Sequence, residues 1–163
     1  MLLGIDIGGT TINIGLVENG RIVRAKTLRS FSPGATKAET IDYLSDAISR
    51  VLVPGVESIG IGVPTIVDPL KGIVYKAVNI PSWDEVHLKD ELEARFHIPV
   101  RVNNDSNCFA LGAARKLDRT YPVMVGITLG TGLGMGVVCG GKLFCGTRCG
   151  VGELGSARYN GAD

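Results

Sequence analysis

One stretch of sequence occurs twice in the chain, and this repeat limits the possible folds more than any other feature. Residues 4–22 read GIDIGGTTINIGLVENGRI, and residues 126–143 repeat the pattern with one deletion, as GITLGTGLGMGVVCGGKL. Each copy reads as an apolar strand, a glycine-rich turn, a second strand and a short turn. Asn19-Gly20 and Gly140-Gly141 supply the positive φ angles that two-residue hairpin turns need. We therefore expect two related hairpins.

The first turn of each hairpin is poor in side chains. It contains Gly8, Gly9 and Thr10 in the first copy, and Gly130, Thr131 and Gly132 in the second. Such turns let backbone N–H groups converge on an anion, and threonine hydroxyls add donors. The repeat therefore predicts a nucleotide held between two related lobes.

Composition narrows the class of protein. Of 163 residues, 45% are hydrophobic and 20% are charged, which is typical of a globular chain. A net charge of +1 gives no electrostatic reason to expect nucleic acid or an anionic membrane as a partner. No stretch approaches the roughly 20 apolar residues of a membrane span, and the first residues enter a strand without a secretory signal. We expect a cytoplasmic protein.

The cysteines give no sign of a metal site. Without a secretory signal, we expect Cys108, Cys139, Cys145 and Cys149 to be reduced and buried. Cys145 and Cys149 lack the C-x-x-C spacing of zinc knuckles, and no histidine lies nearby in the sequence. No structural zinc site is expected.

The remaining pattern predicts an α/β fold with a mixed sheet. We expect strands over residues 2–7, 11–17, 21–27, 58–63, 72–77 and 100–102, helices over 37–53, 88–96 and 106–116, a turn over 64–71, and the second hairpin from Val123. Asn103, Asn104 and Asp105 are expected to cap the third helix. Residues 1–118 would form the first lobe and residues 119–163 the start of a second. Because only residues 144–163 follow the second hairpin, we interpret the second lobe as truncated.

Two carboxylates stand where chemistry is expected. Asp6 lies in an apolar strand beside the glycine turn, where a charge is costly unless it is paired or binds a cation; it either holds Mg²⁺ near phosphates or caps the turn. Asp105 lies between a strand and a helix, where it is either a helix cap or a general base that accepts a hydroxyl proton. We favour the functional interpretation of both.

Other polar residues are candidates for contacts with a substrate. Asn104 adjoins Asp105, and Glu153 stands between glycines that leave room for a ligand whose hydroxyls a carboxylate can accept. Asn79 is a further candidate. The sequence leaves open whether Glu153 is instead a solvated loop acid and whether Asn79 makes such a contact. Trp83 is expected to pack in the core, His87 and His97 to lie on the surface, and Cys108 to lie in the core.

Several motifs together resemble the ROK family of sugar kinases and sugar-responsive repressors, within the actin-like ATPase superfamily. The resemblance covers essentially the whole chain. The matching stretches are DIGGT (6–10), GIGVP (60–64) with VDP (67–69), NIPSW (79–83), VNNDSN (102–107), LGTGLG (129–134) and GELG (152–155).

The resemblance implies a ribonuclease-H-like lobe of the actin/hexokinase type and transfer of the γ-phosphoryl of ATP to a hexose or N-acetylhexosamine hydroxyl, with Mg²⁺, as in a glucokinase. It implies that Asp105 is the base, that Asp6 lies near the phosphates, and that both glycine-rich turns hold them. It also implies a sugar-binding set, and it suggests a homodimer. The residues of the sugar-binding set are Thr65, Asn79, Asn104, Asp105 and Glu153.

Departures from the family pattern leave alternatives open. Ser156 stands where members usually have a histidine that contacts sugar and often zinc, so the sugar preference is in doubt and zinc is not expected there. Thr65 replaces a frequent glycine. A sugar-sensing repressor and a non-catalytic sugar-binding module are the alternatives to a kinase, and the sequence leaves open whether this truncated chain is active alone.

Overall fold

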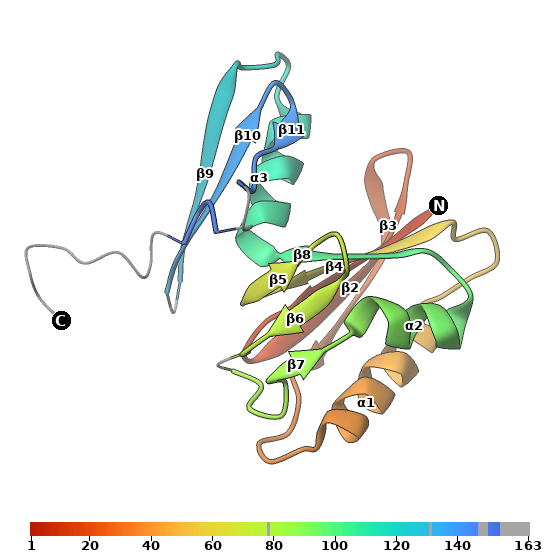
Figure 1. Ribbon diagram of the computed structural model, residues 1–163. Helices are drawn as coiled ribbons and strands as arrows, with labels where there is room; N and C mark the ends of the chain where they lie inside the picture. Colours follow the sequence, from red (N-terminus) through yellow and green to blue (C-terminus); the bar gives the residue numbers. More distant parts are fainter. Residues whose placement is uncertain (78, 131, 147–149, 154–163) are drawn as a thin grey trace, which may run out of the picture. The chain divides into compact units, whose positions relative to one another are not determined.

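The computed structural model describes residues 1–77, 79–130, 132–146 and 150–153 (Figure 1). The chain divides into two compact units, Met1–Asp105 and Ser106–Asp163, here called unit 1 and unit 2. The predicted lobe boundary, after residue 118, lies later in the chain than this division, shortly after the third helix. It stays a prediction. No helix in the described part is long and apolar enough to cross a membrane.

Unit 1 is built on a mixed five-stranded sheet with the order β3-β2-β1-β4-β8. The strands are β1 (Leu2–Ile7), β2 (Thr11–Glu18), β3 (Arg21–Arg29), β4 (Ser58–Val63) and β8 (Val100–Asn104). The first three strands pair antiparallel, whereas β1, β4 and β8 run parallel. The α/β class and the mixed sheet are therefore confirmed.

Smaller elements complete unit 1. The helices are α1 (Lys37–Ser49) and α2 (Leu88–Phe96). A second, three-stranded sheet has the order β5-β6-β7, with β5 (Ile66–Asp68), β6 (Ile73–Tyr75) and β7 (Glu85–Val86). Both helices lie on one side of the larger sheet in Figure 1.

The core of unit 1 follows from strict alternation along the strands. Side chains at every second position of a strand point to the same face, and Leu3, Ile5 and Ile7 are at most 4% exposed. Their partners in β2, β4 and β8 are also buried, and α1 adds Leu44 and Ile48 to the same cluster. The aliphatic face of the sheet is thus covered by helix.

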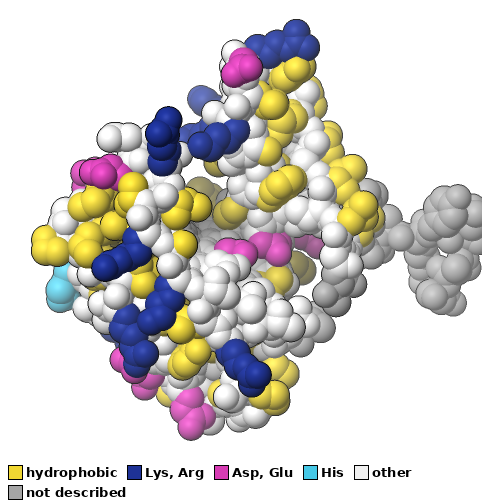
Figure 2. Space-filling model, turned by 180° about the vertical axis from the view of Figure 1, so that it is seen from behind, with side chains coloured by type: hydrophobic (Ala, Val, Ile, Leu, Met, Phe, Trp, Pro, Cys, Tyr) yellow, Lys and Arg dark blue, Asp and Glu magenta, His cyan; other side chains and the backbone are white. Residues whose placement is uncertain are grey.

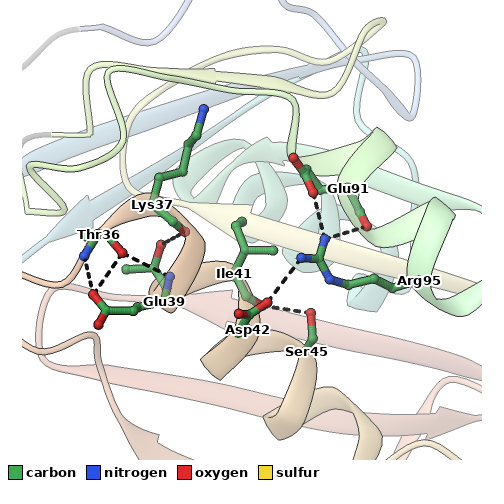
Figure 3. Close-up of polar contacts among 9 residues, drawn as sticks. Thr36, Lys37, Glu39, Ile41, Asp42, Ser45, Glu91 and Arg95 are labelled. Atoms are coloured by element: carbon green, nitrogen blue, oxygen red, sulfur yellow. Dashed lines mark hydrogen bonds and ion pairs between the residues drawn. The ribbon is translucent and has the colours of Figure 1, made fainter.

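Hydrogen bonds fix the start of α1 (Figure 3). The Thr36 hydroxyl accepts from the Glu39 backbone N–H at 3.3 Å, and the Thr36 backbone N–H donates to the Glu39 carboxylate at 2.8 Å. This capping box satisfies two backbone donors of the first turn. Hydrogen bonds from the Thr36 backbone, and then from its side chain, lower the pKa of Glu39.

A second set of polar contacts joins α1 to α2 and to Trp83, which precedes β7. Arg95 of α2 donates to Glu91 at 2.7 Å and to Asp42 of α1 at 3.2 Å, and the Glu91 bond is the main cause that raises the pKa of Arg95 (Figure 3). Trp83 is fully buried, and its indole N–H donates to the Thr40 hydroxyl at 2.7 Å. The predicted packing role of Trp83 is confirmed.

Unit 2 contains most of α3 (Asp105–Lys116) and a three-stranded antiparallel sheet with the order β11-β10-β9. Its strands are β9 (Val123–Leu129), β10 (Leu133–Cys139) and β11 (Lys142–Leu143). The two predicted hairpins are therefore confirmed. Both two-residue turns have positive φ angles, 49° and 73° at Asn19-Gly20 and 55° and 76° at Gly140-Gly141.

Glycines let α3 approach the hairpin of unit 2 closely. A Cβ atom on Gly136 would lie 2.7 Å from the Cβ of Ala110, and one on Gly126 would lie 2.8 Å from the same atom. Side-chain oxygens of Ser106 and Thr128 are 2.9 Å apart at this contact. A side chain at position 126 or 136 would therefore force α3 away from the hairpin.

Several predicted boundaries are wrong. The helix predicted to Val53 ends at Ser49, and the following residues turn, with the N–H groups of Val51 and Leu52 donating to Ile48. The turn predicted over 64–71 contains strand β5. The strand predicted to end at residue 102 continues through Asn103 and Asn104, and α3 begins at Asp105 rather than Ser106. The predicted capping role of Asn103, Asn104 and Asp105 stays a prediction.

The cysteine prediction also needs correction. Cys108 is exposed rather than in the core, because the buried residues of α3 are Ser106, Asn107 and Ala110. Cys139 and Cys145 are half-buried. Cys149 lies outside the described residues. His87 and His97 are exposed, as predicted.

Candidate functional site

The predicted site residues of unit 1 gather where the parallel strands end. Strands β1, β4 and β8 run in the same direction, so their carboxyl ends meet at one edge of the sheet. Asp6 is the second-last residue of β1, Thr65 follows β4, and Asn104 ends β8. Ligands of open α/β sheets bind outside such carboxyl ends.

The glycine-rich turn after β1 is held by its own backbone and by one serine. The Gly8 N–H donates to the Thr11 carbonyl at 2.8 Å, which closes the turn. Ser30 donates twice, from its hydroxyl to the Gly8 carbonyl at 2.8 Å and from its N–H to the Thr10 carbonyl at 2.9 Å. Sequence reasoning missed Ser30, whose position directly after β3 was its only signal.

Asn79 lies against this turn. A Cβ atom on Gly9 would be 3.3 Å from both Cγ and Nδ2 of Asn79. The side chain of Asn79, a predicted sugar contact, therefore lies close to Gly9, a predicted phosphate contact. A residue larger than glycine at position 9 would force them apart. A cavity of about 880 Å³ opens beside the same turn, lined in part by Gly9, Thr10, Arg29 and Tyr43.

Asn104 and Thr65 also lie together. The Asn104 side-chain amide donates to the Thr65 carbonyl at 3.2 Å. The Thr65 hydroxyl donates toward the backbone carbonyls of Tyr75 at 2.7 Å and Lys76 at 3.1 Å. Thr65, which follows β4, is thus hydrogen-bonded both to the end of β8 and to the end of β6. Its hydroxyl holds the backbone at Tyr75 and Lys76 in place.

Asp6 is exposed on the opposite face of β1 from the core residues. Its carboxylate accepts a hydrogen bond from the side-chain NH₂ group of Asn13 at 3.3 Å. The side-chain oxygen of Asn13 in turn accepts from the Thr27 hydroxyl at 2.9 Å. Sequence reasoning missed Asn13 and Thr27. Hairpin register would have revealed Asn13, because it pairs directly with Asp6.

Asp105 is half-buried and is the first residue of α3, directly after Asn104. In unit 2, the Gly130 N–H donates to the Gly132 carbonyl at 3.0 Å, which closes the second glycine-rich turn. Glu153 is exposed, and its N–H donates to the Gly150 carbonyl at 3.4 Å. Thr131 and Ser156 lie outside the described residues.

Comparisons with known proteins identify the family. The ROK family model matches residues 2–161, and the chain belongs to the ROK family. It is 38% identical to the N-acetyl-D-glucosamine kinase of Citrobacter koseri over 97% of the chain and 52% of that protein. A ROK family glucokinase from Streptomyces griseus, solved with glucose and AMPPNP, matches with a TM-score of 0.84 and 34% identity over 97% of the chain and 50% of that structure.

A ROK family transcriptional regulator, a homologue of the E. coli MLC protein, has the same fold. It matches with a TM-score of 0.82 and 25% identity, over 98% of this chain and 42% of that structure. The chain thus spans about half the length of the relatives that it matches. The actin-like fold of ROK sugar kinases is therefore confirmed, and it occurs in both a kinase and a regulator.

Proposed function

We propose that the protein is an ATP-dependent sugar kinase that transfers the γ-phosphoryl group of ATP to a sugar hydroxyl. The observation that carries this proposal is a pair of contacts where the parallel strands end, one between Asn104 and Thr65 and one between Asn79 and Gly9 of the first glycine-rich turn. Asp105 follows Asn104 in the chain. A phosphate-binding turn beside hydroxyl-binding amides is what such a transfer requires.

Each residue has a distinct proposed role. Asp105 accepts the proton of the attacking sugar hydroxyl, and Asn104 and Asn79 bond neighbouring hydroxyls. Backbone N–H groups of the Gly8–Thr10 turn and the Thr10 hydroxyl bind phosphate oxygens. Gly130, Thr131 and Gly132 are proposed as further phosphate contacts, and Glu153 as a further sugar contact.

Mg²⁺ fits the donor set of this edge. The cation prefers oxygen ligands and retains water while it binds one or two carboxylates and nucleotide phosphates. Asp6 presents an exposed carboxylate next to the turn, so it would hold the ion directly or through water. When bound, Mg²⁺ neutralises phosphate charge; the chain's own residues orient the sugar and remove its proton.

N-acetyl-D-glucosamine and glucose are the first substrates to test. The Citrobacter koseri relative is named for the former, and the Streptomyces griseus structure contains the latter. The proposed sugar set includes Thr65, whose hydroxyl is bonded to backbone carbonyls and therefore shapes the pocket wall. N-acetylmannosamine and mannose complete a minimal panel.

The decisive experiment measures ADP release with this panel, using both the chain alone and a chimera that adds the remaining half of the Citrobacter koseri relative. Asp105→Asn keeps the size of the side chain but removes the base. It should lower turnover about 10²- to 10⁴-fold and leave sugar affinity, measured by calorimetry, nearly unchanged. Equal turnover by wild type and Asp105→Asn would contradict the proposed base.

A sugar sensor without turnover is the second candidate, favoured by the likeness to a transcriptional regulator. The same experiment separates the two. Sugar binding without ADP release in either the chain or the chimera would favour the sensor or a non-catalytic binding module. Absence of both sugar binding and turnover would contradict both proposed functions, the kinase and the sugar sensor.

A further inference from the structure

Three polar side chains form a row across the first three strands of unit 1. Asp6 of β1 pairs in register with Asn13 of β2, and Asn13 pairs with Thr27 of β3. All three lie on the face of the sheet opposite the aliphatic core, and all three are exposed. Directly opposed residues on one face are close enough for their side chains to interact.

The row has a defined direction. Asn13 Nδ2 donates to Asp6 Oδ2 at 3.3 Å, and the Thr27 hydroxyl donates to Asn13 Oδ1 at 2.9 Å. A carbonyl oxygen can only accept, so the Thr27 proton favours the orientation in which the NH₂ group of Asn13 faces the carboxylate. The opposite orientation would place two acceptor oxygens against each other.

On the other side of Asp6, the adjacent strand β4 has a glycine at the same level. Gly62 of β4 pairs with Asp6, and Asn103 of β8 is the next residue in that row. A carboxylate beside glycine can rotate toward either strand, because nothing on Gly62 restricts it. The amide of Asn13 is therefore the side-chain contact that selects one position of the Asp6 carboxylate on the β2 side.

We propose that Asn13 and Thr27 are positioning residues for Asp6. Thr27 orients the Asn13 amide, and the amide holds the carboxylate in the position from which it serves the phosphate side of the site. This inference rests on the proposed function of Asp6. The arrangement itself rests only on the register and the two hydrogen bonds.

The first experiment tests the arrangement without any ligand. Thr27→Val removes the hydroxyl at nearly constant volume, and Thr27→Ser is the matched control that retains it. In Thr27→Val, both the side-chain carboxyl ¹³C signal of Asp6 and the side-chain amide signals of Asn13 should shift. In Asn13→Ala, the Asp6 carboxyl signal should shift. In Thr27→Ser, the signals of Asp6 and Asn13 should stay near their wild-type positions. Unchanged Asp6 and Asn13 signals in Thr27→Val would overturn the proposal.

The second experiment asks whether the positioning matters for the nucleotide. Binding of Mn²⁺·ATP is followed by the electron paramagnetic resonance of Mn²⁺, so no turnover is needed. Asn13→Ala should weaken binding about 3- to 10-fold, the ratio expected for one net hydrogen bond, Thr27→Val should weaken it less, and Thr27→Ser should match wild type. Sugar affinity should be the same in all four proteins, which excludes general damage to the fold.

The outcomes separate this inference from the proposed function. If Asp6→Asn binds Mn²⁺·ATP as well as wild type, or wild type does not bind it, the proposed role of Asp6 fails, while the carboxyl signals still decide whether Asn13 and Thr27 hold it. If Asp6→Asn weakens binding but Asn13→Ala does not, the positioning proposal is wrong and the proposed function stands.

Discussion

The two hairpins of this chain have the same sequence pattern but bury different faces. With Gly4 aligned on Gly126, Ile5 corresponds to Ile127 and Ile7 to Leu129. Ile5 and Ile7 are 4% and 0% exposed, whereas Ile127 and Leu129 are 51% and 84% exposed. Exposed hydrophobic side chains accordingly gather along unit 2 in Figure 2, at its upper right.

The glycine faces show the reverse difference. In both hairpins the aligned glycines pair across the strands, Gly4 with Gly15 and Gly126 with Gly136. In unit 2 this face packs tightly against α3, but in unit 1 a Cβ atom on Gly15 would meet its nearest neighbour at 3.6 Å. A hairpin pattern therefore fixes the strands and their register, and the helix that packs on it decides which face is buried.

The strongest test of this difference is a pair of aligned truncations. Ile5→Ala removes a fully packed side chain and should lower the free energy of unfolding by about 2–5 kcal/mol. Ile127→Ala removes a half-exposed side chain and should change it by less than about 0.5 kcal/mol. Urea unfolding followed by Trp83 fluorescence for unit 1 and by amide hydrogen exchange of β9 and β10 for unit 2 measures both.

A large loss of stability in Ile127→Ala would contradict the comparison. It would mean that the aliphatic face of β9 and β10 is covered in solution, for example in an assembly of this chain. Sedimentation of the wild-type chain at the same concentrations shows whether such an assembly exists.

A second aligned pair tests the glycine faces. Gly136→Ala places a methyl group against Ala110 and the Ser106 carbonyl, and should destabilise unit 2 by about 1–3 kcal/mol through overpacking. Gly15→Ala places one at ordinary contact distance and should be nearly neutral, because it also restricts the unfolded chain. Hydrogen exchange of β10 and of β2 reads the two effects separately.

Equal protection of β10 in wild type and Gly136→Ala would show that α3 can move away without cost. A large loss in Gly15→Ala would show that something packs on the glycine face of unit 1. Either result would remove the difference between the two hairpins.

Much of this arrangement could be predicted because it depends on local pattern. The hairpins, α2 and strand β4 follow from alternation, helical spacing and turn residues, which are properties of neighbouring positions. The site motifs could also be found, since glycine-rich turns and polar residues after strands are visible in sequence. The meeting of Asn79 with Gly9 could not, because they are far apart in the chain and the intervening fold brings them together.

The wrong predictions have a common physical cause. Asn103 and Asn104 disfavour strands by propensity, but pairing of β8 with β4 keeps them extended. Val51 continues the apolar spacing of α1 and is buried, although the helix has already ended. Cys108 is exposed because α3 buries its other side. In each case tertiary contacts overrode a local signal.

Helix α1, which packs on the aliphatic face of the sheet in unit 1, offers a test with a smaller expected effect. Thr36→Ala removes the cap of α1 and should lower the stability of unit 1 by about 1 kcal/mol, with Thr36→Ser as the control that keeps the hydroxyl. Hydrogen exchange of β9 and β10 should not change, because α1 belongs to unit 1. A loss of protection in β9 would show that the two units unfold together.

The smallest expected effect is the pH dependence of the same cap. The pKa of Glu39 is lowered in the folded chain because Thr36 donates to its carboxylate, so the folded state binds the Glu39 proton less readily than the unfolded state does. The stabilisation is therefore fully present above the unfolded pKa, near 4.3 for Glu, and is lost as the pH falls through the lower folded value. Glu39→Gln keeps the shape and removes the charge, so its deficit relative to wild type should shrink as the pH is lowered across this interval. Parallel urea titrations of both proteins with Trp83 fluorescence measure that deficit, and a deficit that stayed constant with pH would mean that the charge of Glu39 adds nothing to the stability of the cap.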